Sequence, residues 1–246
     1  MNKKIRILLS VLGIILILLG AGLMIWNKTT AEPMPEALAF LESDPDVTVE
    51  TGHWLIFTPA SEFPDTGFIF YPGAHVDYRA YAPAAHQIAA EGFLVIIVQM
   101  PLGLAVFNTD AAKDVQAAYP QIRHWAIGGH SLGGAMAAAY AKSHPESIEG
   151  LVLWAAYPSA NDSLADSEIR VVSVFGSEDG LATGKKIEAS KQLLPPDTIW
   201  VKIEGGNHAQ FGWYGDQAGD NVATVSREKQ QEQTISATIK MLEQIK

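Results

Sequence analysis

Three polar residues have the types and the order along the chain that nucleophilic catalysis requires. Residues 129–133 read G-H-S-L-G, a pattern in which a serine sits on a sharp turn between a strand and a helix. Asp179 lies downstream in the stretch F-G-S-E-D-G, and His208 follows in the stretch G-G-N-H. A serine hydroxyl is a poor nucleophile at neutral pH, so it needs a base, and the base needs a group that orients it. Ser131, Asp179 and His208 are the candidates for these three roles.

The neighbours of Ser131 match the strand, turn and helix that this pattern needs. Residues 125–127 are a short apolar run typical of a buried strand, and residues 135–142 are rich in alanine and favour a helix. Gly129 and Gly133 remove side chains that would collide with a serine in a strained backbone conformation. One alternative stays open, in which the glycines only permit close packing and the serine is an ordinary helix cap.

The rest of the chain alternates apolar strands with helical segments. Helices are expected over residues 78–91, 109–118, 183–194 and 225–246, and strands over 47–59 (a hairpin), 68–71, 93–98, 148–156, 169–175 and 198–203. This alternation predicts an α/β fold with a mainly parallel sheet and helices on both faces. In such sheets ligands bind beyond the carboxyl ends of the strands, which is where Asp179 and His208 are expected to lie.

With these motifs in place, the chain resembles the α/β-hydrolase superfamily over nearly all of residues 47–246. The resemblance rests on the three motifs at 129–133, 175–180 and 205–208. The chain looks most like the small, lid-poor hydrolases of the dienelactone hydrolase and esterase branch. Dienelactone hydrolases carry a cysteine nucleophile, whereas a serine stands at that position here, which favours cleavage of an ester, a thioester or an amide.

The resemblance implies a role for each candidate. Ser131 is the expected nucleophile, His208 the base and Asp179 the acid that orients it, with Glu178 as the alternative acid. The oxyanion hole is expected to use the backbone N–H of Leu132 and one N–H from residues 73–75.

Within that loop, Ala74 is the foremost candidate. His130, next to the serine, is expected to point away from the site. The apolar residues Leu102, Trp154 and Phe211 are candidates for a pocket wall, with simple packing as the alternative.

The expected reaction is hydrolysis of a small acyl substrate, most simply a carboxylic ester, through an acyl-enzyme. The alternatives are acyl transfer or peptide cleavage with the same three residues, or a catalytically silent binding module. No cofactor and no metal is expected, because Asp216 and Asp220 are too sparse for a calcium site and are expected to face solvent.

Composition excludes several classes of protein. The chain has 246 residues and a formal net charge of −10, which argues against a nucleic acid as the main partner. It contains no cysteine, which excludes a disulfide framework and a thiolate zinc site. The oligomeric state is left open.

The N-terminal stretch reads as a membrane segment. Residues 1–6 carry Lys3, Lys4 and Arg6, and residues 7–26 contain no charged residue, which is long enough to cross a hydrocarbon core of about 30 Å as a helix. We expect residues 1–27 to form an uncleaved signal anchor with the catalytic domain outside the cytoplasm. The alternative is a cleaved signal peptide and a secreted protein. Residues 28–46 are expected to be a linker with one short helix, followed by the domain over 47–246.

Overall fold

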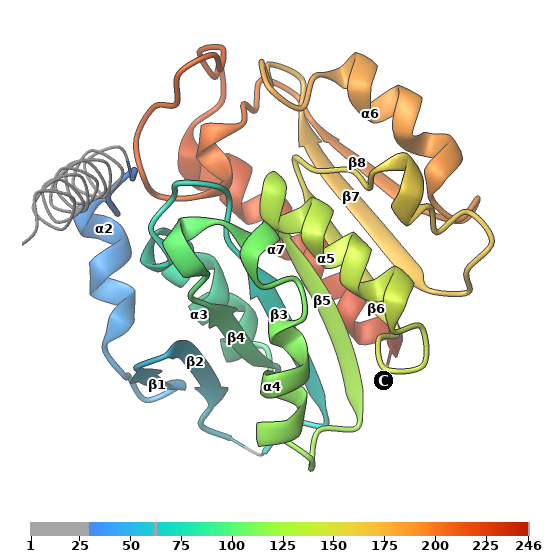
Figure 1. Cartoon of the computed structure of the whole chain (residues 1–246). Coiled ribbons are helices and arrows are strands. Elements are labelled where there is room, and N and C mark those ends of the chain that lie inside the picture. The colour runs from blue at the N-terminus through green and yellow to red at the C-terminus, as the bar shows by residue number, and fades with distance from the viewer. Residues whose placement is uncertain (1–29, 62, 246) are drawn as a thin grey trace, which may run out of the picture. The chain divides into compact units, whose positions relative to one another are not determined.

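The computed structural model describes residues 30–61 and 63–245, which contain eight strands in one sheet (Figure 1). The order across the sheet is β1-β2-β4-β3-β5-β6-β7-β8. The strands are β1 (Val47–Thr51), β2 (Trp54–Pro59), β3 (Thr66–Tyr71), β4 (Leu94–Val98), β5 (His124–His130), β6 (Gly150–Trp154), β7 (Arg170–Gly176) and β8 (Ile199–Ile203). Strand β2 runs antiparallel to β1 and β4, and all other neighbours are parallel. The prediction of a mainly parallel sheet is therefore confirmed.

The registers of the parallel strands bring the ends of these strands level with one another at one edge. Tyr71 of β3 pairs with Gly129 of β5, and His130 pairs with Trp154 of β6. Parallel strands that end level with one another deliver the loops that follow them to the same place. The loops after β3, β5, β7 and β8 accordingly meet at the carboxyl edge of the sheet.

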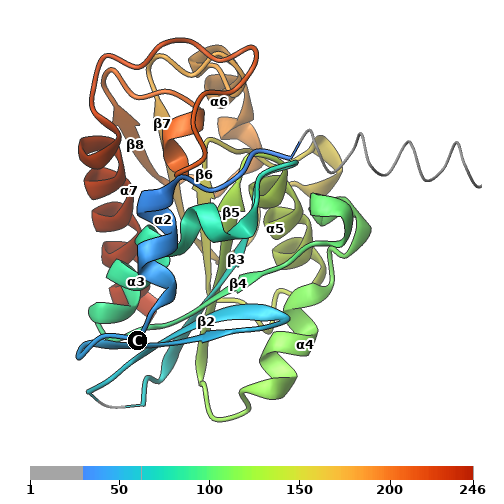
Figure 2. The ribbon, with the colours of Figure 1, turned by 90° about the vertical axis from the view of Figure 1, so that its left-hand side faces the viewer.

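Helices cover both faces of the sheet (Figure 2). Helices α3 (Ala82–Ala90) and α7 (Arg227–Leu242) lie on one face, where α3 contacts β2 and β4 and α7 contacts β6 and β7. Helices α4 (Ala111–Ala118) and α5 (Leu132–Ser143) lie on the other. A further helix, α6 (Gly184–Ser190), connects β7 to β8. The two-sided cover explains why every residue of β3, β4 and β6 is buried, since a strand sandwiched between helices has no solvent face.

Short side chains set the distance between the helices and the sheet. Ala137, Ala138 and Ala141 of α5 are buried against the strands, where longer side chains would hold the helix further away. On the other face, the Trp154 indole Nε1–H donates to Thr238 Oγ1 of α7 at 3.1 Å. Trp154, the last residue of β6, therefore connects the carboxyl edge of the sheet to the buried face of α7.

Residues 32–46 pack on the sheet domain instead of standing apart from it. They contain the short helices α2 (Pro35–Leu38) and η1 (Ala39–Leu41), and Ala37 is fully buried. The Met34 N–H donates to the Trp213 carbonyl at 2.7 Å. The compact unit that contains the sheet begins at Glu32, so this stretch, expected as a linker, forms part of that unit.

The expected membrane helix over residues 7–26 lies outside the described residues. Among the helices of residues 30–61 and 63–245, none combines the length and the apolar composition needed to cross a membrane.

Candidate active site

Ser131 occupies the sharp turn between β5 and α5. Its backbone has φ 52° and ψ −122°, in the region of positive φ that a serine rarely adopts. Both neighbouring elements hold it there. The Ser131 N–H donates to the Trp154 carbonyl at 3.0 Å, and the Ser131 carbonyl accepts from the Ala135 N–H at 3.1 Å. The strain is thus stabilised by the sheet on one side and by the first turn of α5 on the other.

Two glycines allow this turn to touch the end of β3. A Cβ atom on Gly129 would lie 2.5 Å from the Tyr71 carbonyl oxygen, and a Cβ atom on Gly133 would collide with the carbonyl oxygens of Tyr71 and Pro72. The glycines therefore serve the turn and its packing at once. As a result, the loop that follows β3 lies against the first residues of α5.

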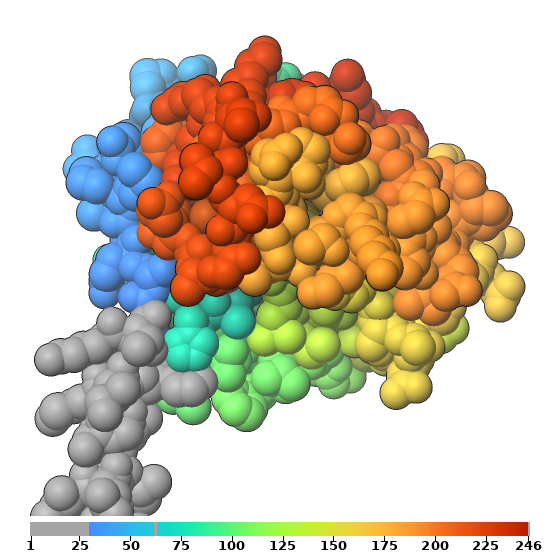
Figure 3. Space-filling model, turned by 90° about the horizontal axis from the view of Figure 1, so that it is seen from above, coloured from blue at the N-terminus to red at the C-terminus, as the bar shows by residue number. Residues whose placement is uncertain are grey.

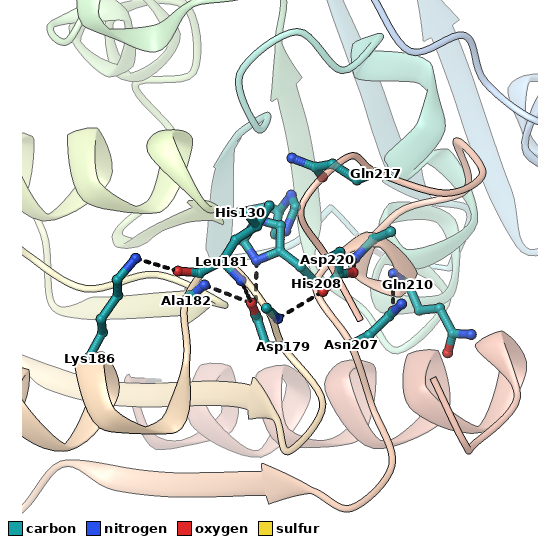
Figure 4. Close-up of polar contacts among 12 residues, drawn as sticks. His130, Asp179, Leu181, Ala182, Lys186, Asn207, His208, Gln210, Gln217 and Asp220 are labelled. Carbon is teal, nitrogen blue, oxygen red and sulfur yellow. Dashed lines mark hydrogen bonds and ion pairs between the residues drawn. The ribbon is translucent and has the colours of Figure 1, made fainter. Parts of the chain in front are cut away.

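His208 and Asp179 form a buried pair (Figure 4). The His208 Nδ1 atom lies 2.8 Å from Asp179 Oδ2, and the exposed fractions of the two residues are 1% and 3%. The other carboxylate oxygen, Oδ1, accepts the N–H groups of Leu181 at 2.8 Å and Ala182 at 2.6 Å. Because an ionised carboxylate can only accept, the proton of this hydrogen bond is assigned to His208 Nδ1.

The His208 ring lies beside the turn that carries Ser131. Its centroid is 4.5 Å from that of His130, the residue before the serine. The His208 Nε2 atom is buried and has no hydrogen-bond partner among the described residues, so a Ser131–His208 hydrogen bond is not present. Hydrogen bonds between catalytic groups are often long before substrate binds. The structure joins Asp179 to His208 and places the His208 ring against His130, the residue before Ser131.

Glu178, the alternative acid, faces a different group. Its carboxylate accepts from the Ser177 hydroxyl at 3.1 Å, and its N–H donates to the Gly206 carbonyl at 2.8 Å. No contact joins the Glu178 side chain to His208 in the described part of the chain. Of the two neighbouring carboxylates, Asp179 is the one that meets the histidine.

Two backbone amides beside the serine are available to an anion. Leu132 is the first residue of α5, so its N–H has no acceptor within the helix. In the loop after β3, the N–H groups of Gly73, His75 and Val76 donate to protein acceptors. None of the hydrogen bonds of residues 30–61 and 63–245 uses the N–H of Ala74 or Leu132 as donor.

Comparison of the sequence with protein families identifies the fold. Residues 67–232 match the model of the alpha/beta hydrolase family, Abhydrolase_5. The chain belongs to the alpha/beta hydrolase family. This confirms the resemblance that the three sequence motifs indicated. No curated protein sequence matches the chain.

Solved structures of hydrolases share the architecture at low sequence identity. An esterase from Thermogutta terrifontis has a TM-score of 0.56 and 16% identity, with 82% of this chain and 93% of that chain covered. A predicted CIB-like hydrolase from Thermoplasma acidophilum has a TM-score of 0.59 and 13% identity, with 79% and 98% covered. An alpha/beta hydrolase enzyme from the metagenome of lagoon sediments of Mar Chica has a TM-score of 0.54 and 16% identity, with 67% and 91% covered.

Tyr81 links the two sides of this hydrolase's site, and the sequence did not reveal it. Its hydroxyl accepts the Gly73 N–H at 3.1 Å and lies 2.9 Å from His130 Nδ1. Burial raises the pKa of Tyr81, so the hydroxyl keeps its proton and forms a neutral hydrogen bond with His130 Nδ1. One side chain therefore ties the loop after β3 to the strand end that carries the serine.

The expectation that His130 points away from the site is wrong. Its ring stacks with Phe211 at a centroid distance of 5.7 Å and lies against His208. Burial first, and then the nearby His208, hold the pKa of His130 well below its usual value of 6.5. His130 is consequently a neutral ring that fills the space beneath the base.

The candidate pocket walls divide into buried and exposed residues. Trp154 and Phe211 are 1% and 0% exposed, so they pack in the core and are not open walls. Leu102, Val106 and Phe107 are more than half exposed on the loop after β4, and the Gly103 carbonyl of this loop accepts the His75 N–H at 3.1 Å. The loop that carries these exposed apolar side chains is therefore hydrogen-bonded to the loop of Ala74. No group of three or more His, Asp or Glu side chains in the described residues is arranged to hold a metal ion.

We predict that Gly133→Ala destabilises the protein by about 2 to 3 kcal/mol, because the new methyl group would push the Tyr71 and Pro72 carbonyls away from the turn. Urea unfolding measures the loss. The matched control is Gly184→Ala at the start of α6, where nothing lies within 4 Å of the added Cβ. That control should be neutral or stabilising by up to about 1 kcal/mol. Equal stabilities of the two variants would contradict the packing.

We predict that His130 makes the protein less stable as the pH falls below 6.5. Below pH 6.5, His130 takes up a proton in the unfolded chain but stays neutral when it is buried in the folded protein. The free energy of unfolding therefore falls by up to about 1.4 kcal/mol per pH unit below 6.5. The free energy of unfolding between pH 7.5 and 5 should therefore fall less steeply in His130→Gln, which cannot be protonated. Parallel curves for the two proteins would contradict a neutral buried ring.

Proposed function

We propose that the chain is a serine hydrolase that cleaves carboxylic esters of small acyl substrates. Ser131 is the nucleophile, His208 is the base and Asp179 orients and stabilises it. The observation that carries the proposal is the buried 2.8 Å pair of His208 and Asp179, set beside a serine held at positive φ on a strand-to-helix turn. Neither the strained backbone nor a desolvated carboxylate is needed for folding, and both are typical of functional sites.

In the proposed reaction, His208 takes a proton from Ser131 and then gives it to the leaving alcohol. Ser131 Oγ attacks the acyl carbon while His208 Nε2 takes the hydroxyl proton, giving a tetrahedral oxyanion. The oxyanion accepts the N–H groups of Leu132 and Ala74. Collapse breaks the ester bond, and His208 returns the proton to the leaving alcohol. Water then attacks the acyl-enzyme with the same base, which releases the acid and restores the serine.

Burial strengthens each electrostatic contribution to this reaction. The Asp179 carboxylate faces the histidine with almost no exposure to water, so its attraction for the transient imidazolium is little screened. The Leu181 and Ala182 amides prevent the same carboxylate from rotating away. The pair is therefore organised for the charge that appears when His208 takes the proton.

The proposed substrate class rests on two further observations. A structural neighbour with the same architecture, from Thermogutta terrifontis, is an esterase. The exposed rim of Leu102, Val106 and Phe107 offers an apolar surface next to the oxyanion loop, which suits an acyl chain. Acyl transfer, peptide cleavage and a silent binding module are the alternatives that the experiments below separate.

We also propose that residues 1–27 anchor the chain in the cell membrane as a single span, with the catalytic domain outside the cytoplasm. The support is the uncharged run of residues 7–26 after Lys3, Lys4 and Arg6, since basic residues stay on the cytoplasmic side. Secretion after cleavage is the alternative.

We predict that a fluorophosphonate labels the purified protein and that Ser131→Ala abolishes the labelling. Labelling reports nucleophilic attack and does not depend on the correct substrate. His208→Ala and Asp179→Ala should each slow the labelling by at least about 100-fold, because the base or its orienting group is lost.

The matched control is Glu178→Ala, which should label within about 3-fold of the wild-type protein. Folded wild-type protein that does not label would favour the binding module. A slow Glu178→Ala beside a fast Asp179→Ala would reverse the acid assignment. Esters, amines as acyl acceptors and short peptides then distinguish hydrolysis, acyl transfer and peptide cleavage.

We predict that the full-length protein remains in the membrane fraction after an alkaline wash and that its N-terminal sequence begins at Met1 or Asn2. External protease should degrade the domain on intact cells, since the proposed orientation places it outside. A soluble mature chain that begins near Ala31 or Glu32 would establish the secreted alternative.

A further inference from the structure

The segment between His208 and α7 returns to the turn that carries Asp179. We name residues 213–222 the strap and residues 177–182 the acid turn, and Figure 3 shows the two side by side on the face that displays the strand ends. A Cβ atom on Gly180 would lie 2.5 Å from the Gly219 carbonyl oxygen and 3.0 Å from the Asn221 nitrogen. The strap and the acid turn are therefore in direct backbone contact.

Asp220 of the strap makes hydrogen bonds to both catalytic loops. Its Oδ1 atom accepts the Gly180 N–H at 2.9 Å, and its Oδ2 atom accepts the Ala209 N–H at 2.9 Å. Gly180 directly follows the acid, Asp179, and Ala209 directly follows the base, His208. A single carboxylate thus bridges the residues next to the two partners, and Figure 4 labels Asp220 near Asp179 and His208.

Asp220 connects the two catalytic loops at a point where strand pairing no longer does so. Strands β7 and β8 are paired up to Gly176 and Ile203, and beyond these residues no strand ladder fixes one loop against the other. Ahead of the catalytic residues, the Glu178 N–H donates to the Gly206 carbonyl at 2.8 Å. Behind the catalytic residues, Asp220 makes the corresponding connection. The acid and the base are held on both sides.

The three amides after Asp179 show how the two carboxylates share the acid turn. Leu181 and Ala182 donate to Asp179 itself, and Gly180 donates to Asp220. Charge-assisted hydrogen bonds to backbone amides are stronger than neutral ones and fix direction. The expectation from sequence that Asp220 simply faces solvent is wrong, because its two oxygens are occupied by distant parts of the chain.

We propose that Asp220 is a positioning residue for catalysis, which holds the His208–Asp179 pair in register by clamping Ala209 and Gly180. The inference rests on the proposed function of that pair. Asp220 has no part in proton transfer in this assignment. Its effect is geometric, and a displacement of about 1 Å between catalytic groups can cost about 100-fold in rate.

The test is Asp220→Asn in the full-length protein. The new amide keeps the size of the carboxylate, but its oxygen can accept from one loop only, and its NH₂ group meets the N–H of the other. We expect kcat with a short-chain nitrophenyl ester to fall about 10-fold to 100-fold with KM changed by less than about 3-fold. The matched control is Asp216→Asn, which removes the same charge from an exposed residue of the same strap. That control should leave kcat within about 2-fold.

A spectroscopic measurement separates positioning from a general loss of stability. In wild-type protein, the proton on His208 Nδ1 should give a low-field NMR signal because it is held by a buried carboxylate. The signal should persist in Asp216→Asn and disappear or broaden in Asp220→Asn at a temperature where both remain folded by near-UV circular dichroism. An unchanged signal and kcat in folded Asp220→Asn would overturn the proposal.

Two further results keep this proposal distinct from the proposed function. The low-field signal requires no substrate, so wild-type protein without fluorophosphonate labelling would reject the serine hydrolase and leave the clamp testable by NMR. If Asp220→Asn does not fold, amide hydrogen exchange in wild-type protein replaces it. Slow exchange of the Gly180 and Ala209 amides supports the clamp, and exchange at the rate of exposed amides would overturn it.

Discussion

The positive φ of Ser131 is the constraint on which the rest of the site depends. A serine at φ 52° is stable only if its surroundings enforce it, and here the Trp154 carbonyl, the first turn of α5 and the end of β3 all do so. The same contact draws the loop after β3 toward the serine. Strain in one residue, glycines on either side of it and the position of Ala74 are therefore parts of a single arrangement.

Around that turn, most buried polar groups are hydrogen-bonded to one another. The Asp179 carboxylate uses both oxygens, and the Tyr81 hydroxyl bonds both the Gly73 N–H and His130 Nδ1. The Nε2 atoms of His130 and His208 are exceptions, since both are buried without a partner in the described structure. A buried acceptor left unsatisfied is costly in a purely structural role. In the proposed reaction, the partner of His208 Nε2 is the Ser131 hydroxyl proton.

Local patterns sufficed to predict the elements and the residues at strand ends. Burial on two faces restricts β4 and β6 to apolar residues, and close packing restricts α5 to small ones. Both restrictions are visible in the local sequence. The Asp179–His208 contact followed from the rule that parallel strands end at one edge. The roles of Tyr81 and Asp220 could not be predicted, since each depends on a loop that returns to a distant turn and neither residue belongs to a motif.

The same limit explains the stretch before β1. Three prolines and polar residues in 28–46 are typical of a linker, whereas burial of Ala37 and the contact of Met34 with Trp213 show that residues 32–46 pack. His130 is a related case. A histidine beside a nucleophile has no sequence signal that distinguishes a surface side chain from one buried under the base, and the neighbouring rings decide it.

Helix α7 supports the loop that carries the candidate base as the chain folds. Gln230 of α7 exchanges two hydrogen bonds with the backbone of Asn207, the residue before His208, at 3.0 Å and 2.7 Å. A nascent or exported chain can contain Ser131, Asp179 and His208 and still lack the support for its base until α7 has emerged and docked. The proposed chemistry would then depend on a helix that contributes no reacting group, because the backbone that carries His208 is fixed only once α7 has docked.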